Sequence, residues 1–183
     1  MSSSDSPCPF CAIAEAYPAT NPTSAGSPSA DDEAHERTSP SAFVVLSTPL
    51  CMAFLDIMPL SPGHILVTTR RHHEKISDVS EEESRELGLW LPRLSRVLAN
   101  VTGVWDWNIV QNNGAAAAQV VPHVHFHIIP RPALTPELRN RSFTMFGRGQ
   151  RSELDDDEAA VLTKDLRKEL ARELERLQNK EKL

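Results

Sequence analysis

Short apolar runs separated by turn-forming residues divide the first two thirds of the chain into predicted strands. The runs lie at 42–46, 52–57, 64–69, 107–110 and 123–129. Pro49-Leu50 separates the first two runs, and the proline- and glycine-containing stretch 59–63 separates the next two. Because so short a connection joins the second and third runs, we expect these strands to pair in an antiparallel arrangement.

Leucines at helical spacing predict two longer helices. One begins at Ser80, where Glu83 completes a capping box, and continues to about residue 100. The other lies beyond Asp155 and carries a leucine every fourth residue from 162 to 174. A shorter helix is predicted over 10–16. With about five strands arriving in hairpin-like pairs, the pattern favours an α+β fold with a five-stranded antiparallel sheet, flanking helices and an extra C-terminal helix.

The chain between Pro18 and Pro40 lacks any apolar period and is rich in proline, serine and alanine, so we expect it to be disordered. The predicted organisation is therefore an N-terminal segment at 1–17, an insert at 18–40, a catalytic domain at 41–150 and an amphipathic C-terminal helix at 151–183.

Composition narrows the function classes. The chain has 183 residues, is 40% hydrophobic and carries a formal net charge of −6, which argues against a nucleic-acid partner. No apolar run approaches the length of a membrane span, and the N-terminus lacks the pattern of a signal peptide. We therefore expect a protein of the cytoplasm, with the nucleus as a second compartment.

The last predicted strand carries the most informative motif. In His123-Val124-His125-Phe126-His127, histidines alternate with apolar residues, so the three rings line one face of a strand, about 6.5–7 Å apart. Residues that titrate near neutral pH are not ordinary surface residues of a strand. The pattern predicts either a metal site or a catalytic nucleophile with helpers.

These residues, with three further segments in the same order, resemble the histidine triad family. The family signature alternates histidine with apolar residues as 123–129 does. Asn112-Asn113-Gly114 through Gln119, the stretches 54–57 and 62–67, and Cys8-Pro9-Phe10-Cys11 resemble its other motifs. The resemblance implies an antiparallel sheet with helices, a homodimer joined at sheet edges, and hydrolysis or transfer of a nucleoside monophosphate through a nucleotidyl-histidine intermediate.

The resemblance also implies roles for individual residues. His125 is the expected nucleophile, and we expect a main-chain carbonyl to hold the proton on its other ring nitrogen. His127 and His64 are the expected helpers. For the substrate, the implied contacts are Asn112 and Gln119 with phosphate, Asp56 with ribose and Ile57 with the base. Taken alone, His64 also fits a core histidine, Asp56 a turn acceptor and Asn112 a turn cap.

The resemblance to zinc-binding members of the family implies a structural zinc ion. Its ligands would be Cys8, Cys11, His72 and His123, with His73 as the competitor of His72. Four protein ligands fill a tetrahedral zinc shell and leave no position for activating water. Two departures from the family pattern concern the loop before the triad. Val120 replaces a common hydroxyl residue, and Ala118 replaces a common glycine.

These observations predict a nucleotidyl hydrolase that acts on purine nucleoside phosphoramidates or related nucleotides. Two alternatives remain at this point. One is a dinucleoside polyphosphate hydrolase with the same intermediate. The other is a nucleotide-binding scaffold with little turnover, which Val120 favours.

Overall fold

The computed structural model describes residues 8–20, 39–133 and 153–181. Most of the predicted insert and the end of the predicted catalytic domain lie outside these residues. The expectations for 21–38 and for 134–150 therefore stay predictions.

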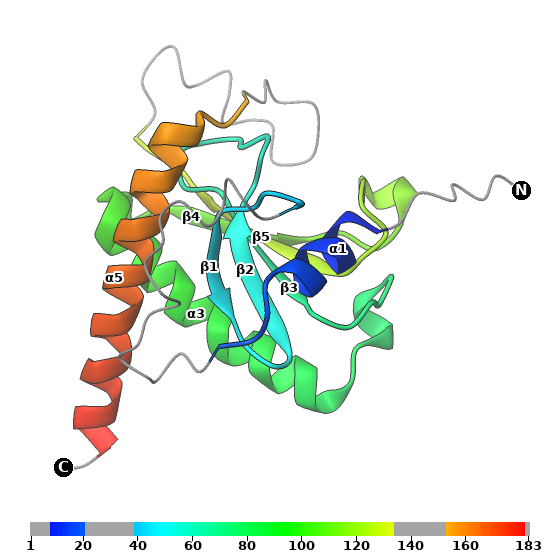
Figure 1. The fold of residues 1–183 in the computed structure, drawn as a ribbon, viewed down its shortest axis with the longest axis horizontal. Coiled ribbons are helices and arrows are strands. Elements are labelled where there is room, and N and C mark those ends of the chain that lie inside the picture. The colour runs from blue at the N-terminus through cyan, green and yellow to red at the C-terminus, as the bar shows by residue number, and fades with distance from the viewer. Residues whose placement is uncertain (1–7, 21–38, 134–152, 182–183) are drawn as a thin grey trace, which may run out of the picture.

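One antiparallel sheet of five strands forms the centre of the described structure (Figure 1). Its strands are β1 (Val44–Ser47), β2 (Cys51–Leu55), β3 (Ile65–Thr69), β4 (Trp107–Gln111) and β5 (His125–Pro130). Their order is β1-β2-β3-β5-β4, and every neighbouring pair is antiparallel. The predicted fold class and the predicted pairing of the second and third strands are confirmed.

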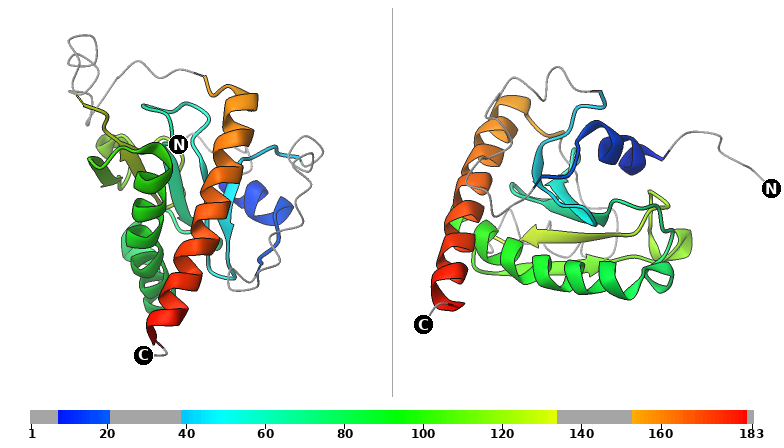
Figure 2. Two further views of the ribbon diagram at one scale, coloured as in Figure 1. Left: turned by 90° about the vertical axis from the view of Figure 1, so that its left-hand side faces the viewer. Right: turned by 60° about the horizontal axis from the view of Figure 1, so that its bottom comes forward.

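Helices cover both faces of the sheet (Figure 2). The N-terminal helix α1 (Pro9–Ala16) lies on one face, and the long helices α3 (Glu81–Thr102) and α5 (Asp156–Glu181) pack on the other. Two short 3-10 turns, η1 (Ile76–Asp78) and η2 (Ala115–Ala117), lie in the loops. Among the described residues, no helix combines the length and apolar character needed to cross a bilayer.

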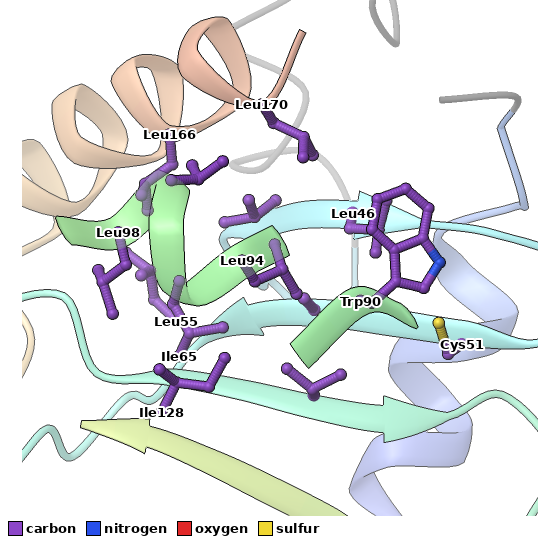
Figure 3. Close-up of a cluster of buried hydrophobic side chains, with 14 of the residues drawn as sticks. Leu46, Cys51, Leu55, Ile65, Trp90, Leu94, Leu98, Ile128, Leu166 and Leu170 are labelled. Atoms are coloured by element: carbon purple, nitrogen blue, oxygen red, sulfur yellow. The ribbon is translucent and has the colours of Figure 1, made fainter. Parts of the chain in front are cut away.

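Coverage of both faces explains why the central strands read as continuous apolar runs and do not alternate with polar residues. Cys51, Ala53 and Leu55 of β2 point into the cluster beneath α3 and α5, whereas Met52 and Phe54 point toward α1. The larger cluster includes Leu94 and Leu98 of α3 and Leu166 and Leu170 of α5 (Figure 3). The C-terminal helix thus packs against its own sheet and α3.

The long helices begin where their sequences predict. Ser80 caps α3: its hydroxyl accepts the Glu83 N–H, and the Glu83 carboxylate accepts the Ser80 N–H. Gly103 ends the helix in the left-handed region at φ 69°, where glycine avoids the steric cost of a side chain. Pro92 lies inside one continuous helix of 22 residues.

The histidine strand differs from its prediction in one respect. The strand β5 begins at His125, so His123 lies just before it. The His123 N–H bonds to the carbonyl of Val121 at 2.8 Å, and the Val124 N–H bonds to the carbonyl of His73 at 2.7 Å. These bonds draw the backbone away from the sheet ladder. The ring of His123 therefore faces a different group of residues from the rings of His125 and His127.

Candidate active site and adjoining metal site

The ring of His125 is held by one strong hydrogen bond. Its Nδ1 lies 2.6 Å from the carbonyl oxygen of His123, so Nδ1 carries the proton and donates it. The expected main-chain acceptor is thereby confirmed. Because the neutral ring has one protonated nitrogen, Nε2 keeps a lone pair. The structure gives His125 the tautomer that a nucleophile needs.

His127 and His64 form the next part of the site. The Nε2 of His64 lies 2.9 Å from the Nδ1 of His127, and the Leu60 N–H donates to the Nδ1 of His64 at 3.2 Å. Since the Nδ1 of His64 is an acceptor, its Nε2 donates to His127. That leaves the proton of His127 on Nε2. The rings of His125 and His127 lie 4.8 Å apart between centroids.

Asp56 completes this group from the end of β2. One carboxylate oxygen lies 3.4 Å from the Nδ1 of His64, and the other accepts the Met58 N–H at 2.9 Å. Both Asp56 and His64 are buried. A buried carboxylate therefore lies directly beside the pair formed by His64 and His127. The adjacent Ile57 is 68% exposed, as a residue that contacts a ligand would be.

Helix α1 covers the histidines. The ring of Phe10 meets the ring of His125 edge-on, with centroids 5.2 Å apart, and lies 5.8 Å from the ring of His123. It also packs against Phe54 at 5.3 Å. Sequence analysis gave Phe10 no role in the site. One feature of the sequence could have indicated this role: Phe10 lies between Cys8 and Cys11, the two cysteines of a motif that resembles the family.

The loop between β4 and β5 is organised by Gln119. Its side-chain oxygen accepts the Gly114 N–H at 2.6 Å, and its nitrogen donates to the carbonyls of Glu74 at 2.8 Å and His123 at 3.4 Å. Gln119 thus bonds to the same carbonyl that orients His125. The side-chain amide of Asn112 has no hydrogen-bond partner among the described residues. Of the two amides expected to bind phosphate, that of Asn112 is the better placed.

The two departures in this loop have structural consequences. Ala118 adopts the left-handed conformation at φ 63°, which costs about 1–2 kcal/mol for a residue with a Cβ. Val120 is 88% exposed and supplies no hydrogen-bond donor. The loop therefore keeps its turn without glycine, but the side chain at position 120 cannot donate a hydrogen bond to a ligand.

Cys8, Cys11, His72 and His123 converge beside the histidines. Their ligand atoms all lie within 4.8 Å of one another. The Nδ1 of His123 lies 3.3 Å from Cys8 Sγ and 3.6 Å from Cys11 Sγ, and the Nδ1 of His72 lies 3.3 Å from Cys11 Sγ. Zinc–sulfur and zinc–nitrogen bonds at a tetrahedral angle hold sulfur and nitrogen about 3.6 Å apart. The separations fit such an ion.

The protonation of His123 also suits a metal ligand. Its Nε2 lies 2.9 Å from the carbonyl of Thr69, so Nε2 donates and Nδ1 presents its lone pair to the sulfurs. Burial lowers the pKa of His123 to about 4, which keeps the ring neutral. Burial and the neighbouring Cys8 raise the pKa of Cys11 to about 11. A metal that binds here therefore displaces a thiol proton.

His73, the competitor of His72 in the sequence, points elsewhere. Its Nε2 lies 3.0 and 3.1 Å from the two carboxylate oxygens of Glu83. Both side chains are buried. Sequence spacing left the choice between the two histidines open because it does not say which ring turns toward the cysteines. The geometry selects His72.

Comparisons with known proteins agree with this geometry. The sequence model of the HIT domain family matches residues 37–134. Adenosine 5′-monophosphoramidase hnt1 of Schizosaccharomyces pombe is 45% identical over 85 residues, which are 46% of this chain and 61% of that protein. The asymmetrical bis(5′-nucleosyl)-tetraphosphatase of the same yeast is 36% identical over 88 residues, 48% of each chain. The chain thus spans about three fifths of the length of the phosphoramidase and about half of the length of the tetraphosphatase.

A solved structure extends the likeness beyond the matched segment. The Zn-bound histidine triad family protein from Mycobacterium smegmatis superposes with a TM-score of 0.61 at 25% identity, covering 90% of this chain and 94% of that one. The family match spans more than half of the chain, and the fold and the histidine strand agree with it. The chain belongs to the HIT domain family.

Proposed function

We propose that the protein is a nucleotidyl hydrolase that cleaves purine nucleoside phosphoramidates or related nucleotides through a nucleotidyl-His125 intermediate. The observation that carries the proposal is the 2.6 Å bond from His125 Nδ1 to the carbonyl of His123, which leaves a lone pair on Nε2. Named relatives support hydrolysis of nucleotides, because one is a phosphoramidase and another a tetraphosphatase.

In the first step the lone pair of His125 Nε2 attacks the α-phosphorus. A nitrogen–phosphorus bond forms as the bond from phosphorus to the leaving amine breaks, and the amine takes the proton from Nε2 of His127. In the second step water attacks phosphorus and gives a proton back to Nε2 of His127, His125 leaves as neutral imidazole, and the nucleoside monophosphate is released. A neutral nucleophile approaches the anionic phosphate without charge repulsion.

His64 assists the proton transfer from His127. While His127 lacks its Nε2 proton, the Nε2–H of His64 donates a hydrogen bond to its Nδ1 across their 2.9 Å contact and stabilises the deprotonated ring. Asp56, 3.4 Å from His64, lies beside that ring and is held in turn by the Met58 N–H. In the substrate complex we assign Asp56 to the ribose hydroxyls, Ile57 to the base and Asn112 to phosphate. Gln119 acts through the loop main chain, whose N–H groups suit an anion.

The proposal includes a structural zinc ion held by Cys8, Cys11, His72 and His123. The three sulfur–nitrogen separations suit a tetrahedral ion, and the M. smegmatis relative is described as Zn-bound. The ion would cross-link α1 to the sheet and supply no catalytic water, since protein atoms fill its shell. Thiol ligands of this kind suit a reducing compartment such as the cytoplasm or nucleus.

The proposal also includes a homodimer that pairs through the edge strand β4. This strand lies at one end of the sheet order and carries Trp107 and Ile109, which are 36% and 45% exposed. Trp105, just before it, is 64% exposed. An exposed apolar edge strand favours pairing with another strand. Light scattering on the purified protein measures the mass directly.

Activity assays on wild type and the variant His125→Ala test the function. Wild type should release ammonia and adenylate from adenosine 5′-phosphoramidate. His125→Ala should lose about a thousandfold or more of kcat, as removal of a nucleophile does. If the variant keeps the wild-type rate while circular dichroism shows a native fold, the assignment of His125 is wrong.

The same assays separate the alternatives. The tetraphosphatase relative supports a second candidate, hydrolysis of a dinucleoside polyphosphate by the same His125 route. A kcat/KM for diadenosine tetraphosphate above that for the phosphoramidate would favour it. Nucleotide binding without turnover of either substrate would instead favour a scaffold, for which the exposed Val120 is the supporting observation.

A further inference from the structure

Three residues after β3 are bonded to both parts of the site. The Nδ1 of His72 contacts Cys11 at 3.3 Å. The carbonyl of His73 accepts the Val124 N–H at 2.7 Å, and the carbonyl of Glu74 accepts from Gln119 at 2.8 Å. The segment 72–74 therefore connects the metal ligands, the nucleophile's strand and the loop before that strand.

The surrounding segment also makes exposed or half-buried hydrogen bonds: the Thr69 hydroxyl donates to the Arg71 carbonyl at 2.8 Å, and the Ile76 N–H donates to the Asn113 side chain at 3.0 Å. From 71 to 78, every residue except His73 is exposed, so His73 supplies the one buried side chain. An exposed segment keeps its backbone position only if some contact opposes its conformational entropy. The side chain of His73 is therefore the one buried anchor of the segment, in addition to these hydrogen bonds.

The anchor point is Glu83 at the start of α3. Its carboxylate oxygens lie 3.0 and 3.1 Å from the Nε2 of His73. One of them also accepts the Ser80 hydroxyl at 2.6 Å and the Ser80 N–H at 3.0 Å. Glu83 is 4% exposed and His73 8%. A buried carboxylate with several donors has a fixed orientation, which a purely apolar contact would not provide.

We infer that His73 and Glu83 are positioning residues that connect the first turn of α3 to the metal ligand His72 and to the backbone that orients His125. Glu83 thus acts on the site without touching substrate. The part of this inference that concerns His125 rests on the proposed catalytic step, and the part that concerns His72 rests on the proposed zinc ion. The part that concerns the Val124 N–H rests on neither.

The inference separates Glu83 from its neighbour Glu82, which is exposed on the same helical turn. The variant Glu83→Gln removes the charged acceptor of His73, and Glu82→Gln removes an equal charge as the matched control. A second pair tests the other partner. His73→Gln keeps a side-chain N–H donor for Glu83, whereas His73→Leu keeps only bulk.

Three measurements on the full chain report the effect. They are zinc affinity by chelator competition, hydrogen exchange of the Val124 amide, and kcat and KM for adenosine 5′-phosphoramidate. Outer-shell partners of metal ligands typically change affinity by about 10–100-fold. We expect Glu83→Gln and His73→Leu to weaken zinc binding and lower kcat by about tenfold each, with KM within about twofold. Exchange at Val124 should become faster.

Glu82→Gln should match wild type in all three measurements, and His73→Gln should restore most of what His73→Leu loses. The inference is overturned if folded Glu83→Gln behaves as Glu82→Gln does, or if His73→Gln and His73→Leu are equally impaired. If Glu83→Gln does not fold, the His73 pair alone decides. If wild type lacks phosphoramidase activity, the proposed function fails, while zinc affinity and amide exchange still test the anchor.

Discussion

Hydrogen bonds to the histidines determine which ring nitrogen carries the proton and which one keeps a lone pair. A chain of bonds runs from the Leu60 N–H through His64 to His127, and a separate bond holds His125 to the His123 carbonyl. Each bond leaves one tautomer. His125 therefore offers a lone pair at Nε2 and His127 a proton at Nε2, the two features that nucleophilic attack and protonation of the leaving group require.

Alternating histidines were enough to predict that the rings of His125 and His127 lie close together, but not which contacts they make or that His123 turns toward the cysteines. His64 is far from His127 in sequence and meets it because Leu66 of β3 pairs with His127 of β5. Asp56 joins them because β2 pairs with β3. Such pairings depend on sheet register, which local spacing does not contain.

The role of His127 predicts a dependence on the leaving group. Without a proton donor, departure of a basic amine should be slowed far more than departure of a group that is stable as an anion, such as p-nitrophenolate. We expect His127→Ala to lower kcat by about 10²–10⁴-fold for adenosine 5′-phosphoramidate. For the p-nitrophenyl ester of adenylate we expect a loss of about tenfold or less. An equal loss for both substrates would contradict the proton-donor role.

At the scale of elements, the helices differ in how they reach the site. Helix α1 contributes Cys11 and Phe10 directly, whereas α3 acts through Glu83. Capping boxes at helix starts are visible in sequence, and Ser80 and Glu83 form one here. That the same carboxylate also binds His73 is not visible, because residue spacing does not show which way the ring turns in the loop between β3 and α3.

Helix α5 is bonded to α3 by a buried carboxylate. Glu173 is 4% exposed and pairs with Arg96 of α3 at 3.2 Å and with Arg176 at 2.7 Å. The hydrogen bonds from Arg176, with the charges of the nearby arginines, hold the pKa of Glu173 below its ordinary value although burial opposes them. A carboxyl whose pKa is lower in the folded state stabilises folding above its unfolded-state pKa. That contribution is lost as the pH falls through the folded-state pKa.

This pair predicts a pH-dependent stability difference. Glu173→Gln should lower the free energy of unfolding by about 1–2 kcal/mol at pH 7, where wild type keeps the charged pair. The difference from wild type should shrink below about pH 4, as Glu173 itself becomes protonated. Urea unfolding at several pH values measures it, with the exposed Glu175→Gln as control. A difference that does not change with pH would contradict the account.

The whole molecule combines the family domain, matched at residues 37–134, with an N-terminal helix α1 and a C-terminal helix α5. The antiparallel sheet and its helices follow from apolar runs and capping residues, and the structure confirms them. The C-terminal helix packs on β1 and α3 in the same core as the sheet, which its leucine spacing alone did not determine. The four candidate zinc ligands come from three separated segments. The family resemblance predicted that these residues bind one ion. The structure shows their ligand atoms close together and shows that His72, not His73, faces the cysteines.

Metal content tests how the N-terminal segment is attached. Wild type should carry about one zinc ion per chain, and Cys8→Ala should lose it and show a lower melting temperature, because α1 loses its cross-link to the sheet. Elemental analysis and calorimetry measure the two effects. Cys51→Ala, which removes a thiol buried in the core, should keep its zinc. A metal-free wild type, or unchanged zinc in Cys8→Ala, would exclude this site.

The central claim is that phosphorus becomes bonded to the ring of His125 during turnover. Rapid acid- or denaturant-quench of wild type with adenosine 5′-phosphoramidate, followed by mass spectrometry of intact protein and peptides, tests it most directly. The account predicts an adenylyl group on the peptide that contains His125, formed and lost at rates that match turnover and absent from His125→Ala. Adenylate production at the full rate with no such adduct at any quench time would contradict it.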